Sequence, residues 1–223
     1  MRLKPTPITH RIARSPTQVF RTNVLPLLLG VALLLANSSR AWGQLDFESE
    51  PINYHKAPVT DRVSRLQERM DSGEVKLNYD EKHGYLRAVL QHLNVPISSQ
   101  MFVFSKTSFQ LRRITPRRPR AVYFNDDVYV GWVQGGDVVE ISSADPQQGA
   151  IFYTLKQESS EAPKYVRDRG QCIVCHASSR TAGVPGHLVR SVYTDHLGQP
   201  LFGAGTFTID HRSPFKQRWG GLS

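Results

Sequence analysis

Both cysteines of this 223-residue chain lie in one five-residue motif, Cys172-Ile-Val-Cys175-His176. Two thiols three positions apart lie on the same side of a helical turn, where each can add to one vinyl group of a single porphyrin. A histidine that directly follows the second cysteine can then bind the iron as an axial ligand. The motif therefore predicts one covalently bound haem c, attached through Cys172 and Cys175, with His176 as the proximal ligand of its iron.

Three other uses of two thiols and an imidazole fit the sequence less well. A structural zinc site needs four ligands, but the chain has no third cysteine, and His187, His196 and His211 form no close pair. A thioredoxin-like dithiol follows a strand in a βαβ unit, whereas residues 165–170 are charged and irregular in pattern. A disulfide across three positions closes too short a loop to stabilise much. The redox dithiol is the main alternative to haem.

The sixth coordination position of the iron would decide what kind of haem site this is. A histidine or methionine there favours electron transfer, and an open position allows small molecules to bind. His187 is the first candidate, because it follows the motif closely in a Gly-Val-Pro-Gly-His segment and its loop costs little to close. His211 is the second and Met101 the third, although a methionine beside Phe102 in an apolar run usually packs in a core.

The first 43 residues have the three parts of a secretory signal peptide. Residues 1–23 are basic and lack acidic side chains, residues 24–36 are apolar, and Ala41-Trp-Gly43 places small residues where a signal peptidase cleaves. We expect removal of residues 1–43 and a periplasmic mature protein. The alternative is an uncleaved chain anchored in the membrane by residues 24–36, although this run is short for a membrane span.

The basic character of the chain resides largely in this leader. The full sequence has 28 lysines and arginines against 19 acidic residues, and without residues 1–43 the balance becomes 22 to 19, so the net charge falls from +9 to +3. A net charge of +3 does not indicate a surface that binds nucleic acid, so nucleic acid is not expected as a partner. A redox partner protein is expected, and membrane association only if the leader stays attached.

A second group of basic residues is internal, in the run 112–120 with its five arginines. Guanidinium groups bind carboxylates through paired hydrogen bonds, so this run could hold the haem propionates or dock an acidic redox partner. The competing interpretation is a solvated loop stiffened by prolines.

Hydrophobic periodicity indicates one domain over residues 61–221, preceded by an extended lead-in at 44–60. Helical spacing followed by Gly73 and by Pro96 predicts helices over 61–70 and 83–93. Short β-branched and aromatic runs between turn residues predict strands over 101–104, 121–124, 128–133, 138–141 and 150–155, and a hairpin of 188–193 with 201–209. The fold class is therefore α+β, a strand-rich antiparallel domain with a few short helices that carries the haem motif. The all-α fold of small cytochromes c is not expected.

Several longer segments resemble an exported bacterial family of cytochrome c domain-containing proteins that is largely uncharacterised; they are residues 98–110, 119–132, 172–179 and 184–191. The resemblance covers about Pro51 to Gly221 and implies a c-type haem, but brings no known substrate. Members of that family continue beyond the segment that here ends in Trp219-Gly-Gly221. We therefore expect a chain truncated at its C-terminus, whose missing part could normally supply a ligand.

Two functions follow from a single covalent haem. The first is electron transfer, and it is favoured because no distal acid–base pair is evident next to the motif. The second is a haem enzyme with an open distal position and peroxidase-like activity, or a fragment of a larger redox enzyme. No catalytic residue is assigned at this stage.

Overall fold

The fold is that of a computed structural model, which describes residues 46–210 and 212–218. The expected signal peptide, residues 1–43, and the candidate ligand His211 therefore lie outside the described residues. Residues 46–210 and 212–218 belong to one compact unit. Within the described ranges, no helix has both the length and the apolar character that a membrane span requires.

A six-stranded antiparallel sheet forms the centre of this unit, and its strands follow one another in chain order. The strands are β1 Met101–Val103, β2 Arg120–Phe124, β3 Val128–Val133, β4 Val138–Asp145, β5 Gly149–Lys156 and β6 Tyr165–Arg167. Together with a few short helices, this sheet confirms the predicted α+β class with mainly antiparallel strands. Turn residues between consecutive strands favour such a meander, because antiparallel neighbours need only short connections.

The sixth strand was not expected. Residues 165–170 were predicted to be irregular, which is wrong for Tyr165–Arg167, since they pair with the end of β5. Tyr165 is buried and Val166 is 58% exposed, as in a strand with alternating side chains. The strand has only three residues, which is too few for this alternation to be recognised in the sequence. Because β6 is antiparallel to β5, the motif that follows it does not lie in a βαβ unit.

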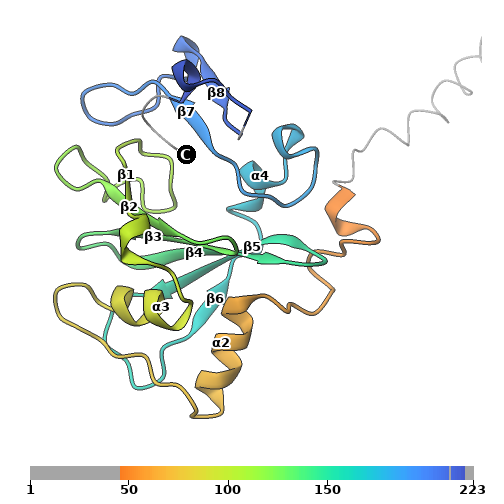
Figure 1. Ribbon diagram of the computed structural model, residues 1–223, viewed down its shortest axis with the longest axis vertical. Coiled ribbons are helices and arrows are strands. Elements are labelled where there is room, and N and C mark those ends of the chain that lie inside the picture. The colour runs from red at the N-terminus through yellow and green to blue at the C-terminus, as the bar shows by residue number, and fades with distance from the viewer. Residues whose placement is uncertain (1–45, 211, 219–223) are drawn as a thin grey trace, which may run out of the picture. The chain divides into compact units, whose positions relative to one another are not determined.

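Two helices cover one face of the sheet (Figure 1). Helix α2, Arg62–Asp71, matches its prediction, and Asp61 caps it by accepting hydrogen bonds from the N–H groups of Val63 and Ser64. Helix α3, Leu86–His92, begins three residues later than predicted. The reason is a turn closed by backbone hydrogen bonds between Asp80 and Gly84, where the positive φ of the glycine (+62°) interrupts helical geometry.

The sheet has two different faces because successive side chains point to opposite sides of each strand. The face toward α2 and α3 is buried and apolar, formed by Ala121, Tyr123, Val128, Val130, Val139, Ile141, Ile151, Tyr153 and Leu155. The alternate residues form the opposite face and include charged and polar side chains; they are Arg120, Val122, Phe124, Tyr129, Gly131, Glu140, Ser142, Phe152 and Thr154. The helices thus leave the second face free for another layer.

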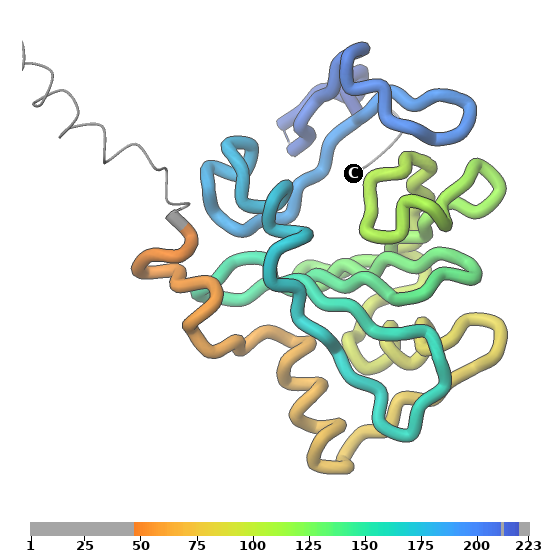
Figure 2. Tube along the Cα trace, turned by 180° about the vertical axis from the view of Figure 1, so that it is seen from behind, coloured from red at the N-terminus to blue at the C-terminus, as the bar shows by residue number. Residues whose placement is uncertain are grey.

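The chain after β6 supplies that layer (Figure 2). It contains the short helix α4, Ile173–His176, and the hairpin of β7, Arg190–Val192, with β8, Thr206–Thr208. The predicted hairpin is therefore present, with shorter strands than expected. The remaining residues form a local bridge between Thr194 and Pro200 and a 3-10 turn at Phe202–Ala204. The 3-10 turn uses residues that were predicted to form the second strand, whereas Thr194 and Pro200 lie outside both predicted strands.

Asp61 joins helix α2 to the sheet, which generates the first prediction. Its second carboxylate oxygen accepts a 2.5 Å hydrogen bond from the Tyr153 hydroxyl on β5. Replacing Asp61 by alanine removes the cap and leaves this buried hydroxyl without its acceptor, so the free energy of unfolding should fall by about 2–4 kcal/mol. Urea unfolding measures the change. Glu68→Ala, at an exposed site on the same helix, should lower stability by less than about 0.5 kcal/mol.

Candidate functional site

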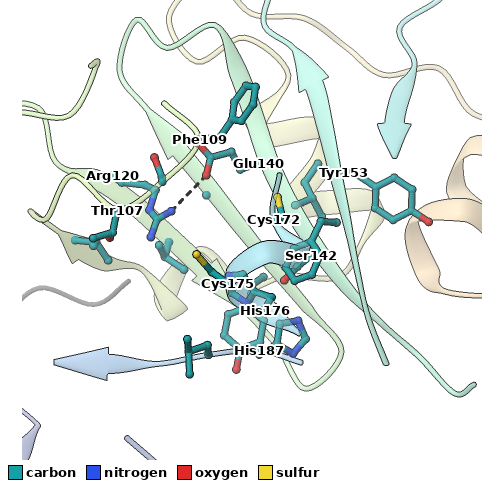
Figure 3. Close-up of a pocket in the computed structure, with 18 of the residues that line it drawn as sticks. Thr107, Phe109, Arg120, Glu140, Ser142, Tyr153, Cys172, Cys175, His176 and His187 are labelled. Atoms are coloured by element: carbon teal, nitrogen blue, oxygen red, sulfur yellow. Dashed lines mark hydrogen bonds and ion pairs between the residues drawn. The ribbon is translucent and has the colours of Figure 1, made fainter. Parts of the chain in front are cut away.

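A cavity of about 610 Å³ lies on the free face of the sheet. Its floor is formed by the side chains of β1 to β5, and Gln171, Cys172, Cys175, His176 and residues 187–189 close it from above (Figure 3). Apart from a few polar groups the lining is apolar and aromatic. The volume falls in the range of pockets that enclose small molecules and cofactors, about 300–1,000 Å³. Cys172, Cys175 and His176, the three residues of the predicted haem motif, thus line one cavity.

Helix α4 brings these three side chains to the same side. Cys172, Cys175 and His176 are related by helical spacing, while Ile173 is buried in the apolar core and Val174 is 74% exposed. The turn begins at Asp168, whose carboxylate accepts the backbone N–H of Cys172 at 2.9 Å and also those of the two residues before it. Asp168 therefore fixes where the helix starts, and the buried isoleucine fixes which side faces the cavity.

His176 is held by two hydrogen bonds to a single glycine. The Nδ1 atom of its ring lies 2.9 Å from the carbonyl oxygen of Gly186, and the N–H of Gly186 donates to the carbonyl of His176, also at 2.9 Å. A carbonyl oxygen only accepts, so Nδ1 carries the proton and Nε2 keeps its lone pair. The ring packs against Phe152, with centroids 4.6 Å apart. Burial lowers the pKa of His176, which favours the neutral imidazole that binds metals.

The loop that carries Gly186 is itself anchored to the sheet. The carbonyl of Pro185 accepts a 2.9 Å hydrogen bond from the N–H of Ala150, at the start of β5. Gly149 makes this approach feasible, since a Cβ there would lie only 2.2 Å from the Pro185 oxygen and the φ angle is +78°. The segment 183–187, which was expected to bring His187 toward the iron, therefore also holds the ring of His176.

The three candidates for the sixth ligand have different positions. His187 lines the cavity, with its ring 4.6 Å from that of Tyr129. The residue is exposed, yet partial desolvation of its ring lowers the pKa of His187 to about 4, and the neighbouring His176 contributes to this shift. Met101 also lines the cavity and is 37% exposed, so the expectation that it packs in a core is wrong. His211 lies outside the described residues.

The two thiols are free, and Cys172 is the less exposed of the two. Burial raises the pKa of Cys172 to about 12, and the nearby carboxylates of Asp168 and Glu140 add to the effect. Catalytic dithiols depend on a thiol whose pKa is lowered to give a reactive thiolate. The environment of Cys172 acts in the opposite direction, which weighs against the redox dithiol.

The basic run 112–120 divides into exposed and enclosed residues. Arg113 is exposed and pairs with Asp137, whereas Arg120 enters the cavity and pairs with Glu140 on β4. Glu140 was not among the residues predicted to belong to the site. Its signal was one acidic residue in the run Val138-Val-Glu-Ile141, where strand alternation places it on the face opposite to Val139 and Ile141.

The donor set decides which cofactor this site could hold. Among the described residues, no group of three or more histidine, cysteine or acidic side chains is arranged to bind a bare metal ion. A haem iron needs fewer protein ligands, because the porphyrin nitrogens supply the others.

Comparison of the chain with protein-family models, curated proteins and solved structures gave no significant match.

The anchoring of the loop at Gly149 generates the second prediction. Gly149→Ala should lower the free energy of unfolding by at least about 3 kcal/mol, because it adds both backbone strain and a clash with the Pro185 carbonyl. Gly183→Ala is the matched control, since its φ angle is +76° but nothing lies within 4 Å of the added Cβ. It should cost only the strain, about 1 kcal/mol. Urea unfolding of the two variants separates the terms, and equal losses would contradict a role for the close approach.

Proposed function

We propose that this chain is an exported c-type haem protein that carries one covalent haem and acts in redox chemistry. The observation that carries the proposal is the hydrogen bond from His176 to the carbonyl of Gly186. Histidines that bind metals usually donate their second ring nitrogen to a carbonyl or carboxylate, which fixes the tautomer and orients the metal-binding nitrogen. Here this arrangement occurs at the histidine that the motif selects as the iron ligand.

The residues of the cavity fit a haem on three further grounds. Both thiols border the same space as His176, and its walls are mostly apolar, as a porphyrin requires. Cys172 and Cys175 would form the thioether bonds, and Nε2 of His176 would bind the iron. No other partner of Nε2 is found among the described residues, so the nitrogen with the free lone pair is available.

Electron transfer is the first candidate activity. A bound haem c would supply one-electron redox chemistry at the iron. The exposure of α4 supports exchange with a partner, because Val174 on its outer side is 74% exposed and Cys175, which borders the cavity, is also exposed. A thioether at Cys175 would thus lie near solvent, where a redox partner protein can approach. That partner is proposed to be a protein in the periplasm, with a leader of residues 1–43 directing export.

A haem protein with an open distal position is the second candidate, and the tether of His187 favours it. Gly186 binds Nδ1, the ring nitrogen that faces away from Nε2, and the peptide bond keeps the Cα atom of His187 beside that carbonyl. A sixth ligand must approach the iron from the side opposite to His176. Ligation of the iron by His187 therefore remains a prediction. The position of its backbone favours the alternative, a haem iron whose sixth coordination site is open.

Covalent attachment and export generate the third prediction. Intact mass of protein from the periplasmic fraction should correspond to residues 44–223 plus one haem, with the haem retained after denaturation. The double variant Cys172→Ala, Cys175→Ala should be cleaved at the same point and carry no haem. Haem that extracts freely into acidified organic solvent would contradict the proposal. A full-length chain found in the membrane fraction would instead support the anchored alternative.

The state of the sixth position gives the fourth prediction. We expect the ferric protein to be high spin and the ferrous protein to bind carbon monoxide, because His187 is held beside Nδ1 of His176. His187→Ala should then leave both spectra almost unchanged. If His187 is the sixth ligand, the unmodified protein will be low spin, and only the variant will be high spin and bind carbon monoxide. Optical and electron paramagnetic resonance spectra separate the two results.

A further inference from the structure

Arg120 and Glu140 form an ion pair on the floor of the cavity. The guanidinium Nη1 of Arg120 lies 3.3 Å from Oε2 of Glu140, and the two side chains are only 14% and 17% exposed. They come from β2 and β4, so the arginine must cross the intervening strand. It crosses at Gly131, where an added Cβ would lie 3.4 Å from the Arg120 Cδ atom. The absence of a side chain at Gly131 thus lets the pair form across β3.

A third residue fixes the carboxylate. Gln110 is buried, and both its backbone N–H and its side-chain amide donate to Oε1 of Glu140, at 3.2 and 3.1 Å. The amide is itself oriented, because its oxygen accepts from the N–H groups of Asp137 and Val138. Glu140 is therefore held in one position by hydrogen bonds to Oε1, and its other oxygen meets Arg120.

One hydrogen-bond donor of the Arg120 guanidinium has no partner among the described residues. Nε of Arg120 is buried and has no hydrogen-bond partner in the described part of the chain. Leaving a buried charged donor without a partner is costly, and such groups commonly serve a ligand or a water molecule. In contrast, Arg113 uses Nε and Nη2 to bind Asp137 on the exposed surface. Nε of Arg167 is also buried without a partner in the described ranges, but Arg120 is the arginine of this kind that lines the cavity.

The pair lies within electrostatic reach of the haem motif. Arg120 contributes to lowering the pKa of His176, after burial, and Glu140 contributes to raising the pKa of Cys172, after burial and Asp168. All four side chains line one cavity, and Figure 3 shows the ion pair on the same side of the sheet as the two sulfurs and the imidazole. A small molecule bound in this cavity would therefore lie near both the ion pair and His176.

The charges decide what kind of molecule this is. The pair is neutral as a whole, and a carboxylate or other anion at Arg120 would be repelled by Glu140. A haem propionate is therefore a poor partner for this arginine. A small neutral molecule with an acidic hydrogen suits both groups, because it can donate to the carboxylate and accept from the guanidinium.

We propose that Arg120 and Glu140 form a distal binding site for small neutral weak acids, of the class of hydrogen peroxide or hydrogen cyanide, that bind iron as their anions. This proposal rests on the proposed covalent haem and on an open sixth position. Glu140 takes the proton of the bound acid, and the resulting anion is stabilised by the positive guanidinium of Arg120. The proton remains on the carboxyl group, so charge is conserved within the site.

Two ligands test this site, because one must lose a proton to bind and the other has none. Hydrogen cyanide is the first probe, added at neutral pH to the ferric protein and followed by stopped-flow absorbance. Carbon monoxide, added to the ferrous protein, is the second. Glu140→Gln should slow cyanide association about 100-fold by removing the proton acceptor. Arg120→Gln should raise the cyanide dissociation rate about tenfold or more by removing the charged donor. Neither variant should change carbon monoxide association more than about twofold.

Control variants carry the same changes at exposed sites. Glu158→Gln and Arg118→Gln should bind cyanide as the unmodified protein does. Equal slowing of cyanide and carbon monoxide in Glu140→Gln would indicate a collapsed cavity and overturn the proposal, as would unchanged cyanide kinetics. A low-spin ferric protein that binds neither ligand would also overturn it, with the covalent haem still in place. A preparation that carries no covalent haem contradicts the proposed function itself, and haem content is measured first.

Discussion

The paired hydrogen bonds between His176 and Gly186 are the constraint on which the rest of the site depends. They fix the protonated nitrogen of the ring and they bring the chain back across the cavity after helix α4. Gly186 is in turn held by its neighbour Pro185, which bonds to the first residues of β5. One glycine therefore couples the orientation of the imidazole to the position of a central strand, and a shift in either would move the other.

The cavity exists because the two faces of the sheet differ in what covers them. One face is covered by α2 and α3 and is largely apolar, with Ser143 as a buried polar residue among its side chains. On the other face, alternate residues of the same strands provide aromatic rings, a glycine and one ion pair, which leaves room for a large group. A small all-helical cytochrome encloses its porphyrin with helices. Here an antiparallel sheet would provide one wall, so groups on neighbouring strands are set at fixed spacings along the floor.

The ion pair of Arg120 and Glu140 changes how the two candidate activities compare. From the sequence, electron transfer is favoured because no acid–base pair is evident next to the motif. The pair is formed by residues twenty positions apart that meet only through strand register and over Gly131. Its presence in the cavity favours the second proposed activity, in which a bound haem would meet exogenous molecules, and the position of His187 acts in the same direction.

The sequence by itself determined the class of the fold, the position of α2 and most strands, and the three residues of the motif. These are local properties, because hydrophobic periodicity, helix capping and motif spacing each depend on residues that are close in the sequence. Tertiary structure decided the short strand β6, the late start of α3, the exposure of Met101 and the meeting of Arg120 with Glu140. It also decided that the loop before His187 holds the ring of His176. Each of these depends on contacts between distant segments, which side-chain periodicity does not encode.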